Sequence, residues 1–438
     1  MSNPLGRRAL LGGAAAGAGA LATLPLTAGT AAATGRGGGR PGRVRPGADV
    51  AQADRWRVLA GQRVGVITNP TGVVQDTLGS VVDAMVGSGR VEVGAVFGPE
   101  HGFRGTAQAG ESEGTSVDER TGVTVHDAYG ADAERFAALY AESGVETVVF
   151  DIQDVGARFY TYIWTMYQAM VAAARTGLRF VVLDRPNPVG GRARGPVLRP
   201  GFTSGVGLDA IAQAHGMTAG EVARFFDGEF LPRVAGRRIA DLEVVRLQGW
   251  RADMLYPDTG LPWILPSPNM PSPTTALLYP GTCLFEATNL SEGRGTTLPF
   301  ELIGAPYVDH RWAEALTRRR LPGVRFREAW FTPTFSKNAN QVCGGVQVHV
   351  TDADAVDPVA LVTHMLVTLR DLYDGFDWRL VGGSSDGGRW MDLLTGSDRF
   401  RTQLEAGASA DAITAGWRDE LRAFDRTRSA YLLYPRSR

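Results

Sequence analysis

Polar, acidic segments follow three apolar runs of the sequence. They are residues 98–105 (GPEHGFRG), 151–158 (DIQDVGAR) and 184–188 (DRPNP). The runs before them have the β-branched, apolar composition of buried strands. In a parallel sheet the carboxyl ends of the strands share one edge, and ligands bind there. We therefore expect these carboxylates to converge. Paired carboxyl groups can protonate a leaving oxygen and stabilise a positively charged sugar ring, which is the chemistry of glycoside hydrolysis.

Glu100 is the first candidate for a proton-transferring group. It follows a predicted buried strand and lies beside Phe97, Pro99 and Phe103 in the sequence. An apolar environment suits a carboxyl group that must hold a proton before it donates it. The alternative is a structural glutamate, in a helix cap or an ion pair.

A second candidate, Glu292, lies in a glycine-flanked segment two residues before Arg294. It can act as a base or a nucleophile. It can also orient a 2-acetamido group, so that the substrate's own amide is the nucleophile. A structural ion pair with Arg294 is the alternative. The strand-end aspartates are further candidates, although each alone is more often a hydroxyl acceptor or a loop brace: Asp151, Asp154 and Asp184.

Other chemistries are disfavoured. The histidines show no HExxH or paired spacing, and Cys283 and Cys343 form no CxxC motif, so we predict no metal site. Lys337 is the only lysine, which disfavours a P-loop or a Schiff base, and we predict no cofactor. The formal net charge of -1 gives no overall attraction to nucleic acid or to an anionic membrane. The two cysteines can form a disulfide or remain buried thiols.

The elements that must position these groups alternate between apolar strands and helices. The predicted strands are 63–68, 91–97, 123–126, 145–151 and 179–184, and the predicted helices are 78–86, 131–143 and 163–176. Gly177 is placed to end the last of these helices. The pattern predicts an α/β fold, with a Rossmann-like parallel-sheet domain covered by helices on both faces.

The second half of the chain predicts a smaller α+β C-terminal domain. Thr218 and Glu221 form a capping box for a helix that runs through Phe226. An irregular stretch, 257–273, is long enough to suggest a functional loop. Strands are predicted at 242–247 and 345–350, and helices at 358–372 and after residue 398. We place the boundary near Leu265, which gives an N-terminal domain of 55–265 and a C-terminal domain of 266–438.

The first residues predict an export signal. Arg7 and Arg8 precede a weakly apolar run, and residues 31–33 (AAA) resemble a cleavage site. We expect a twin-arginine-type signal peptide over 1–33, with no stable membrane span after processing. A transmembrane anchor is the alternative, and the many glycines disfavour it. Residues 34–54, rich in Gly, Arg and Pro, are predicted to be a disordered linker.

Several long motifs resemble the NamZ family of exo-β-N-acetylmuramidases. They are residues 98–105, 150–162, 183–188, 266–271 (PSPNMP) and 288–296 (TNLSEGRGT), and the resemblance extends from about Val58 to the last residue. It implies an exo-acting enzyme that removes β-1,4-linked N-acetylmuramic acid (MurNAc) from N-acetylglucosamine (GlcNAc) at the non-reducing ends of peptidoglycan fragments. It also implies a Rossmann-like domain joined to a smaller one, with the active site in a cleft between them.

The resemblance places the family's catalytic glutamate on Glu100 and a second glutamate on Glu292. MurNAc carries a lactyl carboxylate, which suits a bidentate arginine, and Arg104, Arg158 and Arg294 lie in the matched motifs. The other predicted substrate-binding residues come from the same motifs: His101, Asp151, Gln153, Tyr160, Asp184, Asn187, Asn269 and Asn289. The expected partners are peptidoglycan-derived muro-sugars, and the oligomeric state stays open.

Two other functions fit parts of the sequence. A non-catalytic cell-wall sugar-binding protein also suits two α/β lobes, although neutral sugars need no clustered carboxylates. A serine acyl hydrolase is disfavoured, because no GxSxG segment has a strand–turn–helix context and no SxxK motif precedes the only lysine. The sequence leaves open whether glycoside hydrolysis would retain or invert the anomeric configuration.

Overall fold

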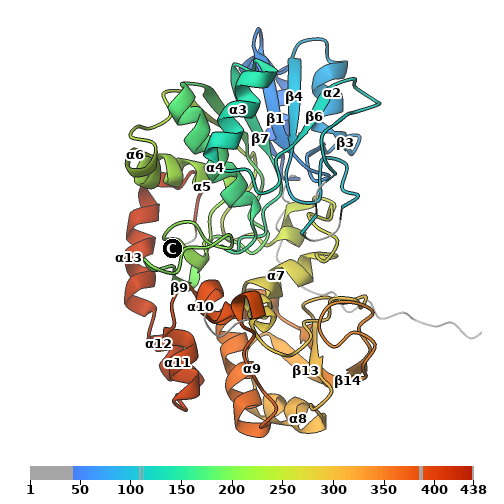
Figure 1. Ribbon diagram of the computed structural model, residues 1–438, viewed down its shortest axis with the longest axis vertical. Coiled ribbons are helices and arrows are strands. Elements are labelled where there is room, and N and C mark those ends of the chain that lie inside the picture. Colours follow the sequence, from blue (N-terminus) through green and yellow to red (C-terminus); the bar gives the residue numbers. More distant parts are fainter. Residues whose placement is uncertain (1–42, 108–109, 112, 384–387, 437–438) are drawn as a thin grey trace, which may run out of the picture. The chain divides into compact units, whose positions relative to one another are not determined.

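The computed structural model describes residues 43–107, 110–111, 113–383 and 388–436 (Figure 1). The predicted signal peptide and the first part of the predicted linker lie outside these residues.

A seven-stranded sheet forms the centre of the N-terminal half, in the order β11-β8-β7-β1-β4-β6-β5. Its strands are β1 Arg63–Thr68, β4 Glu92–Gly98, β5 Ser116–Val117, β6 Thr124–Asp127, β7 Thr147–Asp151, β8 Arg179–Leu183 and β11 Leu242–Val245. All neighbouring pairs are parallel except β5 and β6. Every residue of β7 is buried, as expected for a central strand covered on both faces. The predicted Rossmann-like sheet is confirmed.

Helices cover both faces of this sheet. Because side chains alternate along a strand, Phe150 packs on one face with α3 Ala133–Ser143, α4 Tyr162–Thr176 and α5 Ala219–Phe225. Val149 packs on the other face with α1 Gly47–Ala53 and α2 Val81–Gly87. Figure 1 shows α3 and α4 together on one side of the strands. The predicted helix stop at Gly177 is confirmed, because its φ is 76°. The predicted capping box of Thr218 and Glu221 is confirmed as well.

The prediction of a disordered linker over 34–54 is wrong for its last part, because residues 47–53 form α1. Ala48 and Ala51 are buried against the sheet, and the Gly47 N–H donates to the Asp184 carbonyl at 2.8 Å. Small residues allow this approach: a Cβ at Gly47 would lie 2.4 Å from the backbone of Asp184 and of Val245. Composition suggested disorder, but close packing of Ala and Gly orders the segment.

The C-terminal half contains a three-stranded antiparallel sheet in the order β12-β14-β13, with strands β12 Leu302–Ala305, β13 Val324–Phe331 and β14 Cys343–Val350. Its helices are α7 Pro273–Thr282, α8 His310–Arg319, α9 Pro358–Leu372, α10 Trp390–Thr395, α11 Arg399–Glu405, α12 Ala410–Ala415 and α13 Arg418–Arg428. This α+β composition agrees with the prediction. Beyond α13 the chain returns to the N-terminal half, where Tyr434 packs with Leu247 and Trp250.

Short elements complete the described structure. The strands are β2 Val73–Val74, β3 Gly79–Ser80, β9 Arg194–Val197 and β10 Ala212–Ala214, and the short helices are α6 Leu231–Val234, η1 Arg57–Leu59, η2 Phe226–Phe230, η3 Tyr256–Thr259, η4 Cys283–Ala287, η5 Ala353–Ala355, η6 Val381–Gly383 and η8 Ser429–Tyr431. Within the described ranges, no helix has both the length and the apolar character needed to cross a bilayer.

Both cysteines are buried free thiols, so the structure contains no Cys283–Cys343 disulfide. Burial raises the pKa of the Cys343 thiol to about 11 and that of Cys283 well above its usual range.

Candidate active site

Glu100 lies two residues beyond the end of β4 and is half-buried. Its Oε1 accepts a hydrogen bond from the Gly110 N–H at 2.8 Å, and its Oε2 accepts one from the Thr161 hydroxyl at 3.1 Å. Thr161 is the N-cap residue of α4. The carboxyl group therefore lies at the positive end of a 15-residue helix, which attracts negative charge. Both oxygens have fixed partners, and the group keeps access to solvent.

The backbone next to Glu100 is held in an unusual conformation. His101 has a φ of 71°, in the left-handed region, where residues other than glycine are uncommon. Its ring is buried, and Nδ1 donates to the Ala107 carbonyl at 3.0 Å. Its backbone N–H donates to the Glu111 carbonyl at 3.1 Å. Strained residues of this kind persist where surrounding contacts determine them, and they are frequent at functional sites. His101 thus positions Glu100 through the loop.

Three tyrosines surround Glu100. The Tyr162 hydroxyl donates to the Pro266 carbonyl at 2.7 Å, and its ring lies edge-on to Tyr160, with centroids 5.3 Å apart. Burial raises the pKa of Tyr160 well above 10, and the negative charge of Glu100 adds to this rise. Burial also raises the pKa of Tyr129, to which Glu100 contributes as well. Tyr129 is the exposed member of the group, and its ring is available for a sugar face.

Asp154 is the other carboxylate close to Tyr160, since its charge also raises the pKa of that tyrosine. Its Oδ2 accepts hydrogen bonds from the Gly156 N–H at 2.6 Å and from His215 Nε2 at 3.0 Å. The Met217 N–H donates to His215 Nδ1, which fixes the proton on Nε2. Asp154 Oδ1 is buried and has no hydrogen-bond partner within the described residues. Such an oxygen in a native protein calls for a ligand, a water or a catalytic role.

Glu292 belongs to a separate cluster of charges and is only 2% exposed. Its Oε1 lies 3.2 Å from Arg294 Nε, and its Oε2 lies 2.9 Å from Lys337 Nζ. Arg294 also pairs with Glu286 at 2.8 Å. Lys337 Nζ donates in addition to the carbonyls of Phe285 and Thr288. The two acids and two bases of this cluster neutralise one another, which is the structural alternative considered for Glu292.

Aromatic rings connect the two regions. Tyr160 contacts Tyr279 at a centroid distance of 5.6 Å, and Tyr279 contacts Phe300 at 4.8 Å. The Arg294 guanidinium lies over the Phe300 ring at 5.1 Å. The structure therefore brings the motifs of Glu100, Tyr160 and Arg294 into one neighbourhood, although three rings separate the two charged clusters.

The structure corrects the assignment of three predicted substrate-binding residues, Asp151, Arg158 and Asp184, because none of them has exposed surface. Asp151 forms a bidentate ion pair with Arg185, with distances of 2.5 and 2.9 Å. Arg158 donates to three backbone carbonyls and pairs with no carboxylate among the residues that the structure describes, and burial lowers its pKa to about 9. In this structure these three side chains have no contact with solvent and support the fold.

Asp184 joins distant segments of the chain. Its Oδ1 accepts from the Gly220 N–H at 2.7 Å, and its Oδ2 accepts from the hydroxyls of Thr218 at 2.8 Å and Tyr434 at 2.5 Å. Burial nevertheless raises its pKa to about 7.

Four of the other predicted residues are braces in the structure. Gln153 Nε2 donates to the Asp154 and Pro186 carbonyls, and Asn187 connects the Val189 N–H with the Met217 carbonyl. Asn289 joins Tyr307 to the segment 375–377. Arg104 pairs with Asp83 and Asp118. In this structure these contacts hold the four side chains against their own loops or against neighbouring segments.

Asn269 differs from these braces. It makes no side-chain hydrogen bond within the described residues, and it lies three residues after Pro266, the partner of Tyr162. A hollow of about 520 Å³ is lined by Tyr129 together with Asp127 and Arg135. Across the described ranges, no group of three or more His, Cys, Asp or Glu side chains is arranged to hold a metal ion.

Two family models match the chain. The N-terminal domain of exo-β-N-acetylmuramidase NamZ matches residues 64–274, and the C-terminal domain of the same enzyme matches residues 277–434. This chain belongs to the NamZ family. The peptidoglycan β-N-acetylmuramidase NamZ of Bacillus subtilis (strain 168) is 45% identical over 395 residues, which cover 90% of this chain and 92% of that protein. The resemblance found in the motifs is confirmed, and the chain is a glycosidase.

Solved structures agree with the fold. Two DUF1343 family proteins from Bacteroides fragilis NCTC 9343 match with TM-scores of 0.78 and 0.70, at 32% and 31% sequence identity. Each match covers 90% of this chain and 99% of the other chain. The mixed α/β architecture of this NamZ-family chain is therefore found in crystal structures of relatives.

Several residues of the site were not identified from the sequence. Thr161 lies within a quoted motif, and its position before a helix is the signal that could have identified it. Tyr129 follows β6 by two residues, and the sequence there contains no motif that marks a site. The pairs His215–Asp154 and Lys337–Glu292 join residues 61 and 45 positions apart. No local pattern reports such contacts. Lys337 is the only lysine of the sequence, but that fact gives no sign of its partner Glu292.

Proposed function

We propose that this glycosidase is an exo-acting β-N-acetylmuramidase that releases MurNAc from the non-reducing ends of peptidoglycan fragments by cutting MurNAc-β-1,4-GlcNAc. The Bacillus subtilis relative, named a peptidoglycan β-N-acetylmuramidase, supports the substrate class. The observation that carries the proposal is Glu100, a carboxyl group fixed by Gly110 and Thr161, flanked by tyrosines and open to solvent.

Glu100 is the proton-transferring group of this proposal. Cleavage needs a carboxyl group beside the glycosidic oxygen and a second group that activates water, attacks the sugar or orients its acetamide. The Thr161 hydroxyl and the Gly110 N–H hold Glu100 in one orientation, which reduces the cost of reaching the reactive geometry. Tyr129 supplies an aromatic surface beside it.

The second catalytic group should be a carboxylate with at least one oxygen that is not engaged by another side chain. Both oxygens of Glu292 face cations, Arg294 and Lys337, which favours a structural role for it. Asp154 keeps one oxygen without a hydrogen-bond partner among the described residues. The charges of Asp154 and Glu100 both raise the pKa of Tyr160, so the two carboxylates lie near the same side chain. We assign the second role to Asp154, with His215 as its positioning residue.

Product analysis by NMR on MurNAc-GlcNAc tests the reaction, because it reports the bond cut, the sugar released and the anomer formed. We expect free MurNAc and GlcNAc in equal amounts. Cleavage of longer chains into oligosaccharides without release of free MurNAc, or intact disaccharide after prolonged incubation, would contradict the proposal. The second outcome would favour a sugar-binding protein. A chelator should leave the rate unchanged, because the proposed chemistry uses side chains alone.

The variant Glu100→Gln tests the assignment of the site. General acid–base catalysis contributes roughly 10²–10⁴-fold in rate, so turnover should fall by at least about a hundredfold. Glutamine keeps the size of the side chain, and the melting temperature should stay near that of the wild type. Glu134→Gln, an exposed position on α3, is the matched control and should keep full activity. Wild-type turnover in Glu100→Gln would remove Glu100 from the mechanism.

We also propose that the enzyme acts outside the cytoplasm. The support is the Arg7-Arg8 pair, the apolar run after it and the small-residue segment 31–33. Replacing both arginines with lysine should keep the unprocessed protein inside cells that otherwise export it, as an immunoblot of cell fractions would show. Equal export of the Lys-Lys variant would contradict a twin-arginine route.

A further inference from the structure

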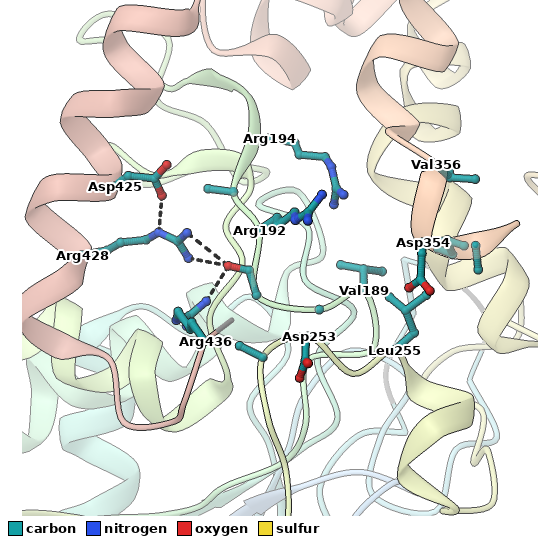
Figure 2. Close-up of a pocket in the computed structure, with 16 residues that line it drawn as sticks. Val189, Arg192, Arg194, Asp253, Leu255, Asp354, Val356, Asp425, Arg428 and Arg436 are labelled. Carbon is teal, nitrogen blue, oxygen red and sulfur yellow. Dashed lines mark hydrogen bonds and ion pairs between the residues drawn. The ribbon is translucent and has the colours of Figure 1, made fainter. Parts of the chain in front are cut away.

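An arginine-lined cavity of about 590 Å³ lies apart from the Glu100 region (Figure 2). Its walls come from the loop after β8, residues 252–255, Leu277 of α7, the segment before α9, and α13 with the tail that follows it. None of the predicted site residues lines it. Its volume is within the range of ordinary small-molecule sites, roughly 300–1,000 Å³.

Helix α7 separates this cavity from the candidate active site. Leu277 lines the cavity, whereas Tyr279, two residues later, packs against Tyr160. Residues two apart on an α-helix point about 200° apart, since each residue turns the helix by about 100°. The cavity is therefore separate from the side chains gathered around Glu100.

Two of the four arginines in the cavity are committed to the fold. Arg428 donates to the carbonyls of Gly191 and Gly216 and pairs with Asp425 at 2.6 Å. Arg436 pairs with Glu221 at 2.8 Å and donates to the same two carbonyls. These bonds fix the loop from which the other two arginines project.

The remaining arginines, Arg192 and Arg194, are left with little compensating charge. Figure 2 shows both between α13 and the segment before α9. Arg192 makes no side-chain hydrogen bond or ion pair within the part of the chain that the structure describes, and Arg194 has one ion pair, to Asp357 at 3.5 Å. Burial lowers the pKa of Arg194, and the charge of Arg192 lowers it further while Asp357 opposes this. Two adjacent guanidiniums of this kind suit a carboxylate.

The facing wall has the opposite charge. Asp354 is exposed and makes no hydrogen bond or ion pair within the described residues, while Asp253 and Asp425 already pair with Arg251 and Arg428. Apolar side chains line the same cavity: Val189, Leu255, Leu277 and Val356. The cavity thus offers two cations, apolar side chains and one anion, which are the groups that would hold the carboxylate, the short apolar body and the ammonium group of one molecule.

We propose that this cavity binds a zwitterionic ligand of the amino-acid or short-peptide class, with its carboxylate on Arg192 and Arg194 and its ammonium on Asp354. The site is distinct from the glycosidase site and does not depend on the assignment of Glu100.

Calorimetric titration with the dipeptide L-alanyl-L-alanine tests the proposal. N-acetyl-L-alanyl-L-alanine lacks the ammonium, L-alanyl-L-alanine amide lacks the carboxylate, and inorganic phosphate probes a plain anion site. We expect the dipeptide to bind and each analogue to bind at least about tenfold more weakly, because each loses one charge-assisted contact. No binding of the dipeptide in the millimolar range, or phosphate binding as tightly as the dipeptide, would overturn the proposal.

Variants locate the binding. Arg192→Gln/Arg194→Gln should weaken dipeptide binding at least about tenfold. Asp354→Asn should weaken binding of the free dipeptide but not of its N-acetyl analogue. Arg237→Gln, which removes an exposed arginine outside the cavity, is the matched control and should bind as the wild type does. Melting temperatures check that the variants fold, and their turnover on MurNAc-GlcNAc should be unchanged. Equal binding by the double variant and the control would refute the site.

Discussion

Replacing Asp184 with asparagine should change how the stability of the protein depends on pH. The side chain is fully buried and accepts hydrogen bonds from Gly220, Thr218 and Tyr434. Burial raises its pKa from the usual 3.8 to about 7 in spite of these bonds. A tenfold change in an ionisation constant corresponds to about 1.4 kcal/mol, so ionising this group in the folded protein costs roughly 4 kcal/mol more than in the unfolded chain.

The sign of the effect follows from the direction of the shift. Because the pKa is raised in the folded state, the folded protein binds the proton more tightly than the unfolded chain does. The contribution of protonated Asp184 to the stability of the folded protein is fully present below the pKa of the unfolded chain, near 4. This contribution is lost as the pH rises through 7. Asparagine resembles the protonated acid at every pH. The free energy of unfolding of Asp184→Asn, relative to that of the wild type, should therefore rise by up to roughly 4 kcal/mol between pH 4 and pH 8.

Urea unfolding at a series of pH values measures this difference, followed by far-UV circular dichroism and fitted by linear extrapolation. Asp118→Asn is a control with the opposite sign. The hydrogen bond from Arg104 lowers the pKa of Asp118, so its stabilising contribution is present above the unfolded pKa and is lost as the pH falls. A difference between Asp184→Asn and the wild type that is constant from pH 4 to pH 8, or that falls with pH, would show that the hydrogen bonds outweigh burial and would refute the reasoning.

Three other substitutions test the charged groups. Lys337→Met should lower the free energy of unfolding by on the order of 2 kcal/mol, because it leaves buried Glu292 with Arg294 alone, and unchanged urea unfolding would contradict this. Glu292→Gln should keep turnover on MurNAc-GlcNAc within about threefold of the wild type, whereas a loss like that of Glu100→Gln would restore Glu292 to the mechanism. Asp154→Asn should reduce kcat at least about a hundredfold with little change in KM, and a change in KM alone would make Asp154 a binding residue.

The sheet and its helices could be predicted because their signals are local. Buried parallel strands are apolar at every position, as in 147–151, and helix ends carry their own marks, such as Gly177 and the Thr218–Glu221 capping box. The segment 47–53 has no such signal, since it resembles the glycine-rich residues before it. Only its contacts with β8 and β11 order it. Tertiary packing of small side chains leaves no pattern in the local sequence.

The candidate site was predicted less well, for a related reason. The sequence does not show which polar residues pair with one another inside the motifs. Asp151 has Arg185 as its partner, 34 positions away, and Asp184 has Tyr434, 250 positions away. A carboxylate that is paired in this way is not available for catalysis. The two pairs that matter most to the proposed mechanism, Asp154–His215 and Glu292–Lys337, are also long-range.

Whether a strand-end carboxylate is free for chemistry depends on what covers the strand end. Asp151 is paired with Arg185, and Asp184 lies under α1, α5 and the returning C-terminal tail, so both carboxylates are buried and act as braces. The loop after β4 is not sealed in this way. Its left-handed turn at His101 and Gly102 folds the chain back on itself, and Glu100 keeps contact with solvent. The left-handed conformation of His101 costs backbone energy, but it turns the chain so that Glu100 is held in place and still reaches solvent. The position of Glu100 in the motif would not by itself give this exposure.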